Sequence, residues 1–392
     1  MKASRRLTLI ERRSKYPARV NGSIPLYQAS KNKGGDKVIR IGIDAGKNKC
    51  VATLKRDSKE ILERVTFTNK TEGIMELVGH AKGYGEEAVA VVESTGNYWI
   101  RIHDMLEENG INTLLANPVQ TKAIAKARIK DDKIDSNILA DLLRADLIPE
   151  SFVPDREHRE LRQLVRTRID LVRNRTAFKE KVHAVLAKYE FESPVTDIFS
   201  IKGIAWLRSI ELSWIDRMAM NAYIDTMNVL DAQVEKFTAK IASIAKEDDS
   251  VKMLMTIPGI DYFTALTIMS EIVDVKRFST PWKLVAYSGL APSRRDSGNS
   301  KKRGGITRLG SKWLRYALVE AVNTTIRYDE RLGAFYKRIA KRRGPQKAKV
   351  ATAKEMLVII WHMLTNNEPY RTMNKDLVER KYKKMEWQSR SA

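Results

Sequence analysis

Apolar residues recur with strand-like and helix-like spacing from Val38 onward. The segment VIRIGIDAGKNKCVATL (residues 38–54) predicts two strands joined by a turn around Gly46–Asn48, and residues 65–68 are a candidate third strand. The continuous apolar run AVAVV at residues 88–92 is typical of a strand buried on both faces. Helical spacing is present at residues 71–81, from the turn at 94–97 to about residue 108, and at 134–144, and a short strand is expected at 111–117. Strands and helices therefore alternate along this part of the chain. This pattern predicts an α/β domain over residues 38–150.

The second half of the chain has helical spacing without comparable strand signals. Residues 156–189 are helical and strongly basic, and a second long helical stretch covers residues 220–246. Two long helices without strands predict a helical hairpin or coiled-coil-like arm within residues 151–250, of the kind that serves packing or dimerisation. Residues 251–330 indicate a compact, mostly helical domain, and residues 331–392 a basic helical C-terminal extension. The predicted fold class is therefore α/β plus all-α.

The net charge of the chain indicates what kind of partner it binds. Its 392 residues include 71 Lys and Arg against 48 Asp and Glu, a net charge of +23. Self-repulsion of that size opposes folding, so the excess predicts a polyanionic partner, usually nucleic acid. An acidic membrane surface is the other possibility, but the chain has no apolar run long enough to span a membrane. The basic tail, residues 1–37, is either an arm on nucleic acid or an extension without a role.

The few cysteines and histidines of the chain exclude several kinds of site. The single cysteine, Cys50, excludes internal disulfides and cysteine-ligated zinc, and it fits a reducing cytosol. The five histidines are too widely spread to give a pair with ligand spacing. The sequence also lacks the G-x-x-x-x-G-K-[ST] phosphate loop, which argues against ATP use.

Four acidic residues stand at positions that suit a metal site. Asp44 ends a hydrophobic strand before a glycine turn, and Glu93 ends the AVAVV strand. Asp132 and Asp135 are three residues apart at the start of a helix and share one of its faces. Singly, each residue could be a helix cap or a loop charge. Together, their order and strand contexts resemble an RNase H-like site, in which hard oxygen ligands hold Mg²⁺ for phosphoryl transfer.

The sequence IPGI at residues 257–260 indicates a turn between two helices. This helix-hairpin-helix-like pattern can present backbone N–H groups to a DNA phosphate, and the expected contacts are at Pro258 and Gly259. The alternative is an ordinary packing unit of two helices.

Residues 288–315, SGLAPSRRDSGNSKKRGGITRLGSKWLR, form a cationic segment that we expect to be a loop. It has eight Lys and Arg against one acidic residue, which suits phosphate binding. Ser297, between Asp296 and Gly298, is either a solvated loop serine or a nucleophile that a metal or cation activates. The residues expected to contact nucleic acid here are Arg294, Arg295, Lys301, Lys302, Arg303, Arg308 and Lys312.

Several of these motifs, in a fixed order, resemble the DEDD insertion-sequence recombinases, a group that includes Piv-type DNA invertases and bridge-RNA-guided transposases. The N-terminal motifs are IGIDAGKNK, VVESTGNYW and KDDKIDSNILADLLR. The C-terminal motifs are IPGI, YSGLAP, DSG and GGITRLGSKWLR. The resemblance covers roughly residues 38–327. The chain departs from the family at Asp296, where Gln is frequent, and in the length of its basic tail.

The resemblance implies a RuvC-like domain with an RNase H fold, in which Mg²⁺ or Mn²⁺ is held by Asp44, Glu93, Asp132 and Asp135. It also implies that Ser297 is the nucleophile. Donor and target DNA would be the substrates, and a non-coding guide (bridge) RNA a partner. Strand exchange between two duplexes needs four cleavages, so a homo-oligomer is implied, a dimer that forms a tetramer on DNA. A prokaryotic, cytoplasmic and nucleoid-associated protein is expected.

Two other functions compete with a serine recombinase. The first is a RuvC-like endonuclease or hydrolytic transposase, in which metal activates water and no covalent adduct forms. The second is an architectural or RNA-binding protein with an inactivated RNase H fold. The presence of all four acidic residues argues against the second.

Overall fold

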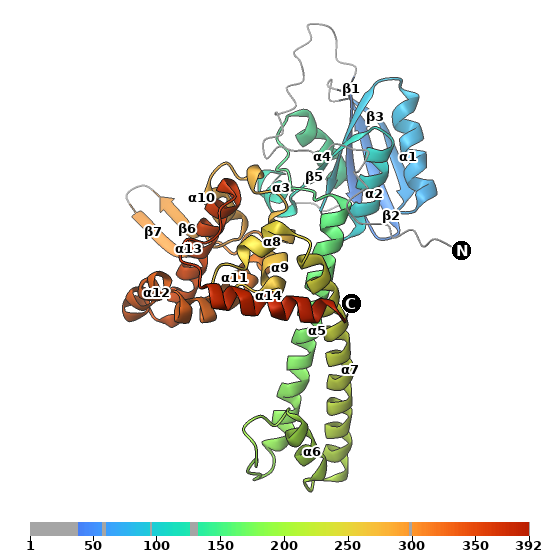
Figure 1. Cartoon of the computed structure of the whole chain (residues 1–392). Helices are drawn as coiled ribbons and strands as arrows, with labels where there is room; N and C mark the ends of the chain where they lie inside the picture. The colour runs from blue at the N-terminus through green and yellow to red at the C-terminus, as the bar shows by residue number, and fades with distance from the viewer. Residues whose placement is uncertain (1–37, 57–59, 95, 126–131, 298–299, 392) are drawn as a thin grey trace, which may run out of the picture. The chain divides into compact units, whose positions relative to one another are not determined.

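The computed structural model describes residues 38–56, 60–94, 96–125, 132–297 and 300–391 (Figure 1). The chain divides into two compact units, one that ends at Val153 and another that begins at Pro154. The first is mixed α/β and the second is mostly helical, which confirms the predicted fold class at that level. Within the described ranges, no helix combines the length and apolar character needed to cross a membrane.

A five-stranded sheet organises the first unit. The strands lie in the order β3-β2-β1-β4-β5, with β1, β2 and β3 antiparallel and with β4 and β5 parallel to β1. This arrangement is consistent with the expected RuvC-like domain. The elements of this unit are β1 (Val38–Ala45), β2 (Lys49–Lys55), β3 (Ile61–Thr68), α1 (Thr71–Gly83), β4 (Glu87–Glu93), α2 (Tyr98–Glu108), β5 (Asn112–Ala116), α3 (Pro118–Ala125) and α4 (Asp132–Arg144).

Helices cover both faces of this sheet because its central strands are apolar on both sides. On one face, α1 and α2 bury Leu77 and Leu106 against a cluster that includes Ile41. On the other face, α4 packs its Leu139 against Val91 of β4. The sheet therefore lies between two helical layers, as Figure 1 shows for α1, α2 and α4.

The contact between β1 and α4 is unusually close at Gly42. A Cβ atom built on Gly42 would lie 2.1 Å from the carbonyl oxygen of Ser136 and 2.4 Å from the amide nitrogen of Ala140. Beside this contact, the hydroxyl oxygens of Ser136 and Thr53 form a buried hydrogen bond of 2.9 Å. Only glycine allows the helix backbone to lie this close to the strand.

Two long antiparallel helices, α5 and α7, form an arm in the second unit (Figure 1). One end of the pair packs on the helical body, where Val165 and Ile241 join its core. The other end has a core of its own with α6, around Val182, Leu207 and Ile224. The elements of this unit are α5 (Arg156–Leu186), α6 (Ile201–Ser209), α7 (Trp214–Ala245), α8 (Asp249–Leu254), α9 (Tyr262–Ile272), the 3₁₀ helix η1 (Val275–Arg277), α10 (Pro281–Tyr287), β6 (Pro292–Ser297), β7 (Ser300–Ile306), α11 (Lys312–Tyr328), α12 (Glu330–Arg343), α13 (Pro345–Asn366) and α14 (Lys375–Ser389).

The cationic segment differs from the expected loop. Residues 292–297 and 300–306 pair as an antiparallel two-stranded hairpin, β6 and β7. Its strands carry many charged residues and no apolar alternation, so the sequence pattern did not indicate them. The second long helix is also longer than predicted, since α7 begins at Trp214.

The glycine contact gives a first prediction. Gly42→Ala forces α4 away from β1 and lowers the free energy of unfolding by about 3 kcal/mol, near the upper end of the usual cost of overpacking. Gly79→Ala is the control, because an added carbon there meets nothing within 4 Å on α1. It raises the free energy of unfolding by about 0.5–1 kcal/mol through helix propensity. Chemical denaturation measures both, and equal effects would contradict the close contact.

Candidate active site

Two of the predicted carboxylates lie at one edge of the sheet. In the parallel pair of β1 and β4, Ile43 stands opposite Val92. The next residues along each strand are Asp44 and Glu93, so both lie at the carboxyl ends of neighbouring parallel strands. This edge is where parallel sheets place ligands and catalytic groups.

The two carboxylates also belong to one face of the sheet. Successive side chains of a strand alternate between faces, so residues two apart share a face. Gly42, two residues before Asp44, lies against α4. Val91, two residues before Glu93, packs against α4 through Leu139. Asp44 and Glu93 therefore face the side of the sheet that α4 covers.

The direction of α4 brings its first turn to the same edge. Ser136 bonds to Thr53, which pairs with Gly42. Farther along the helix, Asp141 accepts a 2.8 Å hydrogen bond from Lys55, which pairs with Arg40 of β1. The helix thus runs opposite to β1, and its N-terminal turn points toward the end of the strand that carries Asp44.

Asp132 and Asp135 both belong to that N-terminal turn of α4. Asp135 is half-buried and directly precedes Ser136. The side chain of Asp132 lies outside the described residues. Among the side chains that are described, no three acidic, histidine or cysteine groups gather closely enough to hold a metal ion. The backbone nevertheless directs all four predicted positions to one end of the sheet.

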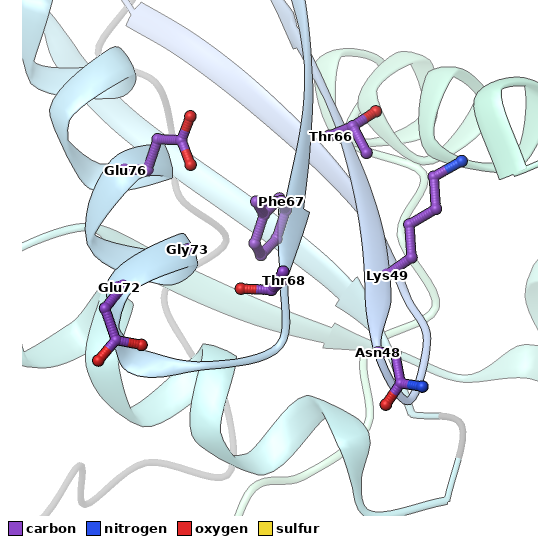
Figure 2. Close-up of a pocket in the computed structure, with 8 residues that line it drawn as sticks. All are labelled: Asn48, Lys49, Thr66, Phe67, Thr68, Glu72, Gly73 and Glu76. Atoms are coloured by element: carbon purple, nitrogen blue, oxygen red, sulfur yellow. The ribbon is translucent and has the colours of Figure 1, made fainter.

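A surface hollow of about 300 Å³ occurs in the same unit, on the α1 side of the sheet (Figure 2). It is lined by Lys49 at the start of β2, by the end of β3, and by Glu72 and Glu76 on α1. Figure 2 shows Phe67 pointing from β3 toward α1. The described lining residues include none of the predicted catalytic carboxylates, so this hollow is not the predicted metal site.

Ser297 is the last residue of β6, at the tip of the cationic hairpin, and stands opposite Ser300 of β7. The side chains of residues 294–303, Ser297 included, lie outside the described residues, and so does Gly298. Nearer the hairpin's base, the Ser293 hydroxyl donates a 2.9 Å hydrogen bond to the carbonyl oxygen of Gly305. Ser293 thus has a structural partner within the hairpin.

Positive residues occupy opposed positions along this hairpin. Arg294 stands opposite Arg303, and Arg295 opposite Lys302. Like charges at directly opposite positions destabilise a strand pair, so this pattern does not serve the stability of the isolated hairpin. It does suit a polyanion that lies along the strands.

Arg308 and Lys312 lie beyond the hairpin and are both exposed. Arg308 has a positive φ of 56° and its backbone N–H donates to the carbonyl oxygen of Gly289 at 3.1 Å. Lys312 begins α11, with its ammonium 4.9 Å from the ring centre of Trp313. Both cations are therefore accessible to a phosphate backbone beside the hairpin.

The IPGI turn packs against α11. Pro258 is buried, and its carbonyl oxygen accepts a 2.6 Å hydrogen bond from the hydroxyl of Thr325 on α11. A Cβ atom at Gly259 would lie 2.5 Å from the carbonyl oxygen of Ala321 on the same helix. These contacts show that the turn packs closely against α11. They leave the backbone N–H group of Gly259, which is partly exposed, as a predicted phosphate contact.

A partly buried lysine also contacts the chain at this turn. The ammonium of Lys381 on α14 donates hydrogen bonds of 2.6 and 2.7 Å to the carbonyl oxygens of Met255 and Ile257. Burial lowers the pKa of Lys381 from its usual value to about 8. Sequence pattern gave no signal for this contact, because the lysine lies 126 and 124 residues along the chain from its partners, in a helix with several other lysines.

Sequence reasoning also missed a cluster in which arm residues meet α11. Arg166 and Arg173 of α5 lie 5.6 and 5.0 Å from the ring centre of Trp313, and Arg173 lies 5.1 Å from that of Tyr316. Such cation–π contacts use the planar guanidinium group. The only available signal was the placement of arginines along a long helix beside an aromatic-rich one.

The chain thus combines a mixed sheet that carries acidic residues at its carboxyl edge with a helical unit that carries a cationic, serine-bearing hairpin. A DEDD-type transposase model matches residues 41–191, and a model of the IS116/IS110/IS902 transposase family matches residues 251–337. Together the two matches cover more than half of the chain. The chain belongs to the IS110 family of transposases.

Individual relatives support the same assignment. The chain is 26% identical over 298 residues to the transposase for insertion sequence element IS1111A of Coxiella burnetii, which covers 72% of this chain and 79% of that protein. It is 31% identical over 206 residues to a putative transposase of Sinorhizobium fredii, covering 53% and 50%. It is 26% identical over 341 residues to the pilin gene-inverting protein of Moraxella bovis, covering 84% and 97%.

The hairpin charges give a second prediction. Replacing Lys301, Lys302 and Arg303 by Gln lowers the salt dependence of DNA binding, because fewer counterions are released from the phosphates. The slope of log K against log salt falls by about 2–3 units if each cation contacts one phosphate. Fluorescence anisotropy over a salt series measures the slope. The charge-conserving control, Lys301→Arg, Lys302→Arg and Arg303→Lys, keeps it; an unchanged slope in the neutral variant would exclude these residues from the interface.

Proposed function

We propose that this protein is a DNA recombinase of an insertion sequence, which cuts and rejoins donor and target DNA through a phosphoserine intermediate. The observation that carries the proposal is the coexistence of two elements in one chain. Asp44 and Glu93 share an edge and a face of the sheet, toward which the first turn of α4 points. Ser297 ends a strand of the cationic hairpin. The relatives named as transposases and gene-inverting proteins support rearrangement of DNA.

In the proposed step, the hydroxyl oxygen of Ser297 attacks a phosphorus atom of the DNA backbone. An oxygen–phosphorus bond forms as the bond from that phosphorus to one deoxyribose oxygen breaks. The serine proton passes to a base or to solvent, and the departing deoxyribose oxygen takes up a proton. One ester replaces another, so a deoxyribose hydroxyl of a second duplex can reverse the step without ATP. A reaction that needs no ATP agrees with the absence of a G-x-x-x-x-G-K-[ST] phosphate-binding loop from the sequence.

The acidic residues suit a divalent cation as the cofactor. Carboxylate oxygens are the ligands that Mg²⁺ prefers, and Mn²⁺ accepts the same donors. Asp44, Glu93, Asp132 and Asp135 would hold the ions. When bound, these ions supply positive charge to the oxygens of the scissile phosphate. The chain's own part is to fix the carboxylates: two on a strand edge and two on the first turn of α4.

Donor and target DNA are the proposed substrates, and a non-coding guide RNA is the proposed additional partner. The net charge of +23 supports a protein that holds several nucleic-acid strands at once. The RNA partner rests on the resemblance to the bridge-RNA-guided branch of the family. Sequencing of RNA that copurifies with the protein tests it: a structured transcript from the flank of the coding region is expected.

A homodimer through the arm, and a tetramer on DNA, are the proposed assembly. Apolar side chains are exposed at the end of the arm, with Ile201 92%, Trp214 77% and Met218 63% accessible. Exposed apolar groups of this size are typical of a contact surface. Four strand cleavages, each with one serine, then require four chains.

The metal assignment gives a third prediction. Glu93→Gln abolishes recombination and reduces the rise in melting temperature on adding Mg²⁺ or Mn²⁺, because a ligand is lost. Without metal, the variant is at least as stable as the natural protein, since a carboxylate leaves a repelling cluster. The matched control is Glu87→Gln, an exposed position at the opposite end of the same strand. Full activity of Glu93→Gln with Mg²⁺ would show that Glu93 is not a ligand.

The nucleophile gives a fourth prediction. Ser297→Ala binds DNA with unchanged affinity but forms no denaturation-resistant protein–DNA adduct. Ser300→Ala, directly opposite in the hairpin, and Ser293→Ala keep adduct formation. Denaturing gels measure the adduct, and mass spectrometry is expected to locate it on the peptide that contains Ser297.

The same experiment separates the alternative functions. Metal-dependent cleavage without any adduct would favour a RuvC-like endonuclease or hydrolytic transposase. Binding without cleavage of element-end DNA, with the cognate RNA present, would favour an architectural protein.

A further inference from the structure

Glu271 is a buried carboxylate near the end of α9 that has no part in the chemistry proposed above. It is 1% exposed, and Arg166 of α5 donates to its Oε1 atom from Nε at 2.9 Å and from Nη2 at 2.6 Å. A buried ion pair gives little net stability, because both charges lose their hydration. Its presence is therefore better explained by the geometry that it holds than by the stability that it adds.

The second carboxylate oxygen of Glu271 holds Ser311. The Ser311 hydroxyl donates a 3.0 Å hydrogen bond to Oε2 of Glu271 and accepts one of 3.0 Å from the backbone N–H of Leu314. Ser311 is the N-cap of α11, so this single hydroxyl joins the start of that helix to α9.

Ser311 also belongs to the base of the hairpin that carries Ser297. Its backbone N–H donates to the carbonyl oxygen of Tyr287 at 2.8 Å, and that of Thr307 donates to the carbonyl oxygen of Ala291 at 2.9 Å. These bonds join the chain before β6 to the chain after β7. The two ends of the hairpin are therefore held together at a shared base, and Ser311 connects this base to Glu271.

The arm contacts the same point from the other side. Arg162 of α5 donates to the carbonyl oxygens of Ser270 at 2.8 Å and of Glu271 at 2.9 Å. Together with Arg166, it fixes the end of α9 to the arm helix. Glu271 is thus the residue at which α5, α9 and the base of the hairpin meet.

We propose that Glu271 is a positioning residue for Ser297: through Ser311 it fixes the base of the hairpin, and through Arg166 it ties that base to the arm. The inference rests on the proposed function, because it gives Glu271 a role in the step that Ser297 performs. A reacting group misplaced by about 1 Å can lose a hundredfold in rate. A two-stranded hairpin with opposed like charges needs such a support at its base.

The first test compares the N-cap residues of α11 and α14, whose capping hydrogen bonds have the same length. Ser311→Ala removes the bond to Glu271 together with the α11 cap, whereas Asn374→Ala removes only the α14 cap, whose bond to Leu377 is also 3.0 Å. Both variants are expected to lower the melting temperature, Ser311→Ala more than Asn374→Ala, because it also removes a donor from buried Glu271. Only Ser311→Ala is expected to slow adduct formation at saturating DNA, by at least tenfold, with an unchanged Kd for DNA. Ser311→Thr, which keeps the hydroxyl, restores the rate.

The second test examines Glu271 itself. Glu271→Gln weakens the bonds to both Arg166 and Ser311, and it is expected to slow adduct formation at least as much as Ser311→Ala. The double variant is expected to be no slower than Glu271→Gln alone, because both changes break the same connection. Independent, multiplying losses in the double variant would overturn the proposal, as would a normal rate in Ser311→Ala.

Amide hydrogen exchange tests the support of the hairpin without relying on adduct formation, so it distinguishes a failure of this inference from a failure of the proposed function. In the free protein, Ser311→Ala is expected to speed exchange in peptides that span residues 292–306 by about tenfold, whereas Asn374→Ala does not. If the natural protein forms no Ser297 adduct but the exchange effect is present, the proposed function fails and the support of the hairpin stands. Unchanged exchange in Ser311→Ala refutes the support.

Discussion

The contact of α4 with β1 at Gly42 determines where the acidic residues lie. The helix backbone approaches so closely that a single methyl group would lie 2.1 Å from a carbonyl oxygen. This contact sets the depth of the helix, and the bonds of Ser136 to Thr53 and of Asp141 to Lys55 set its direction. Strand pairing alone could bring Asp44 and Glu93 together. The pair Asp132 and Asp135 reaches the same edge only because α4 lies where Gly42 allows it.

The two candidate catalytic elements are supported in different ways. The carboxylates stand on a buried sheet, where main-chain pairing and two apolar layers fix their positions. Ser297 stands on a hairpin whose charged strands have no apolar face of their own. That hairpin therefore depends on its base, and the base depends on the buried contacts of Glu271. A polyanion that neutralises the opposed cations would add support from the outer side.

Sequence pattern predicted the parts of the fold that depend on local periodicity. The strands around Asp44 and Glu93 and the helix that begins near Asp132 were visible because apolar residues recur along them. The hairpin was missed because a strand such as SKKRGGI has no alternation of apolar and polar residues. Glu271 was missed because its partner Arg166 is 105 residues away, and nothing near Glu271 in the sequence indicates a buried ion pair. The packing of the turn at Pro258 on α11 was missed for a similar reason: Thr325, whose hydroxyl donates to the Pro258 carbonyl oxygen, is remote in sequence.

Partly buried cations in the second unit bind main-chain carbonyl oxygens at turns. Lys381 bonds to Met255 and Ile257, and Arg315 bonds to Ser288 with a length of 2.8 Å. Burial lowers the pKa of both cations, and the charge of nearby Arg308 lowers that of Arg315 further. The hydrogen bonds to these carbonyl oxygens offset part of the free-energy cost of removing the charges from water. In a chain with this excess of positive charge, lysine and arginine therefore serve in two settings: exposed ones suit a polyanionic partner, and partly buried ones hold the main chain at turns.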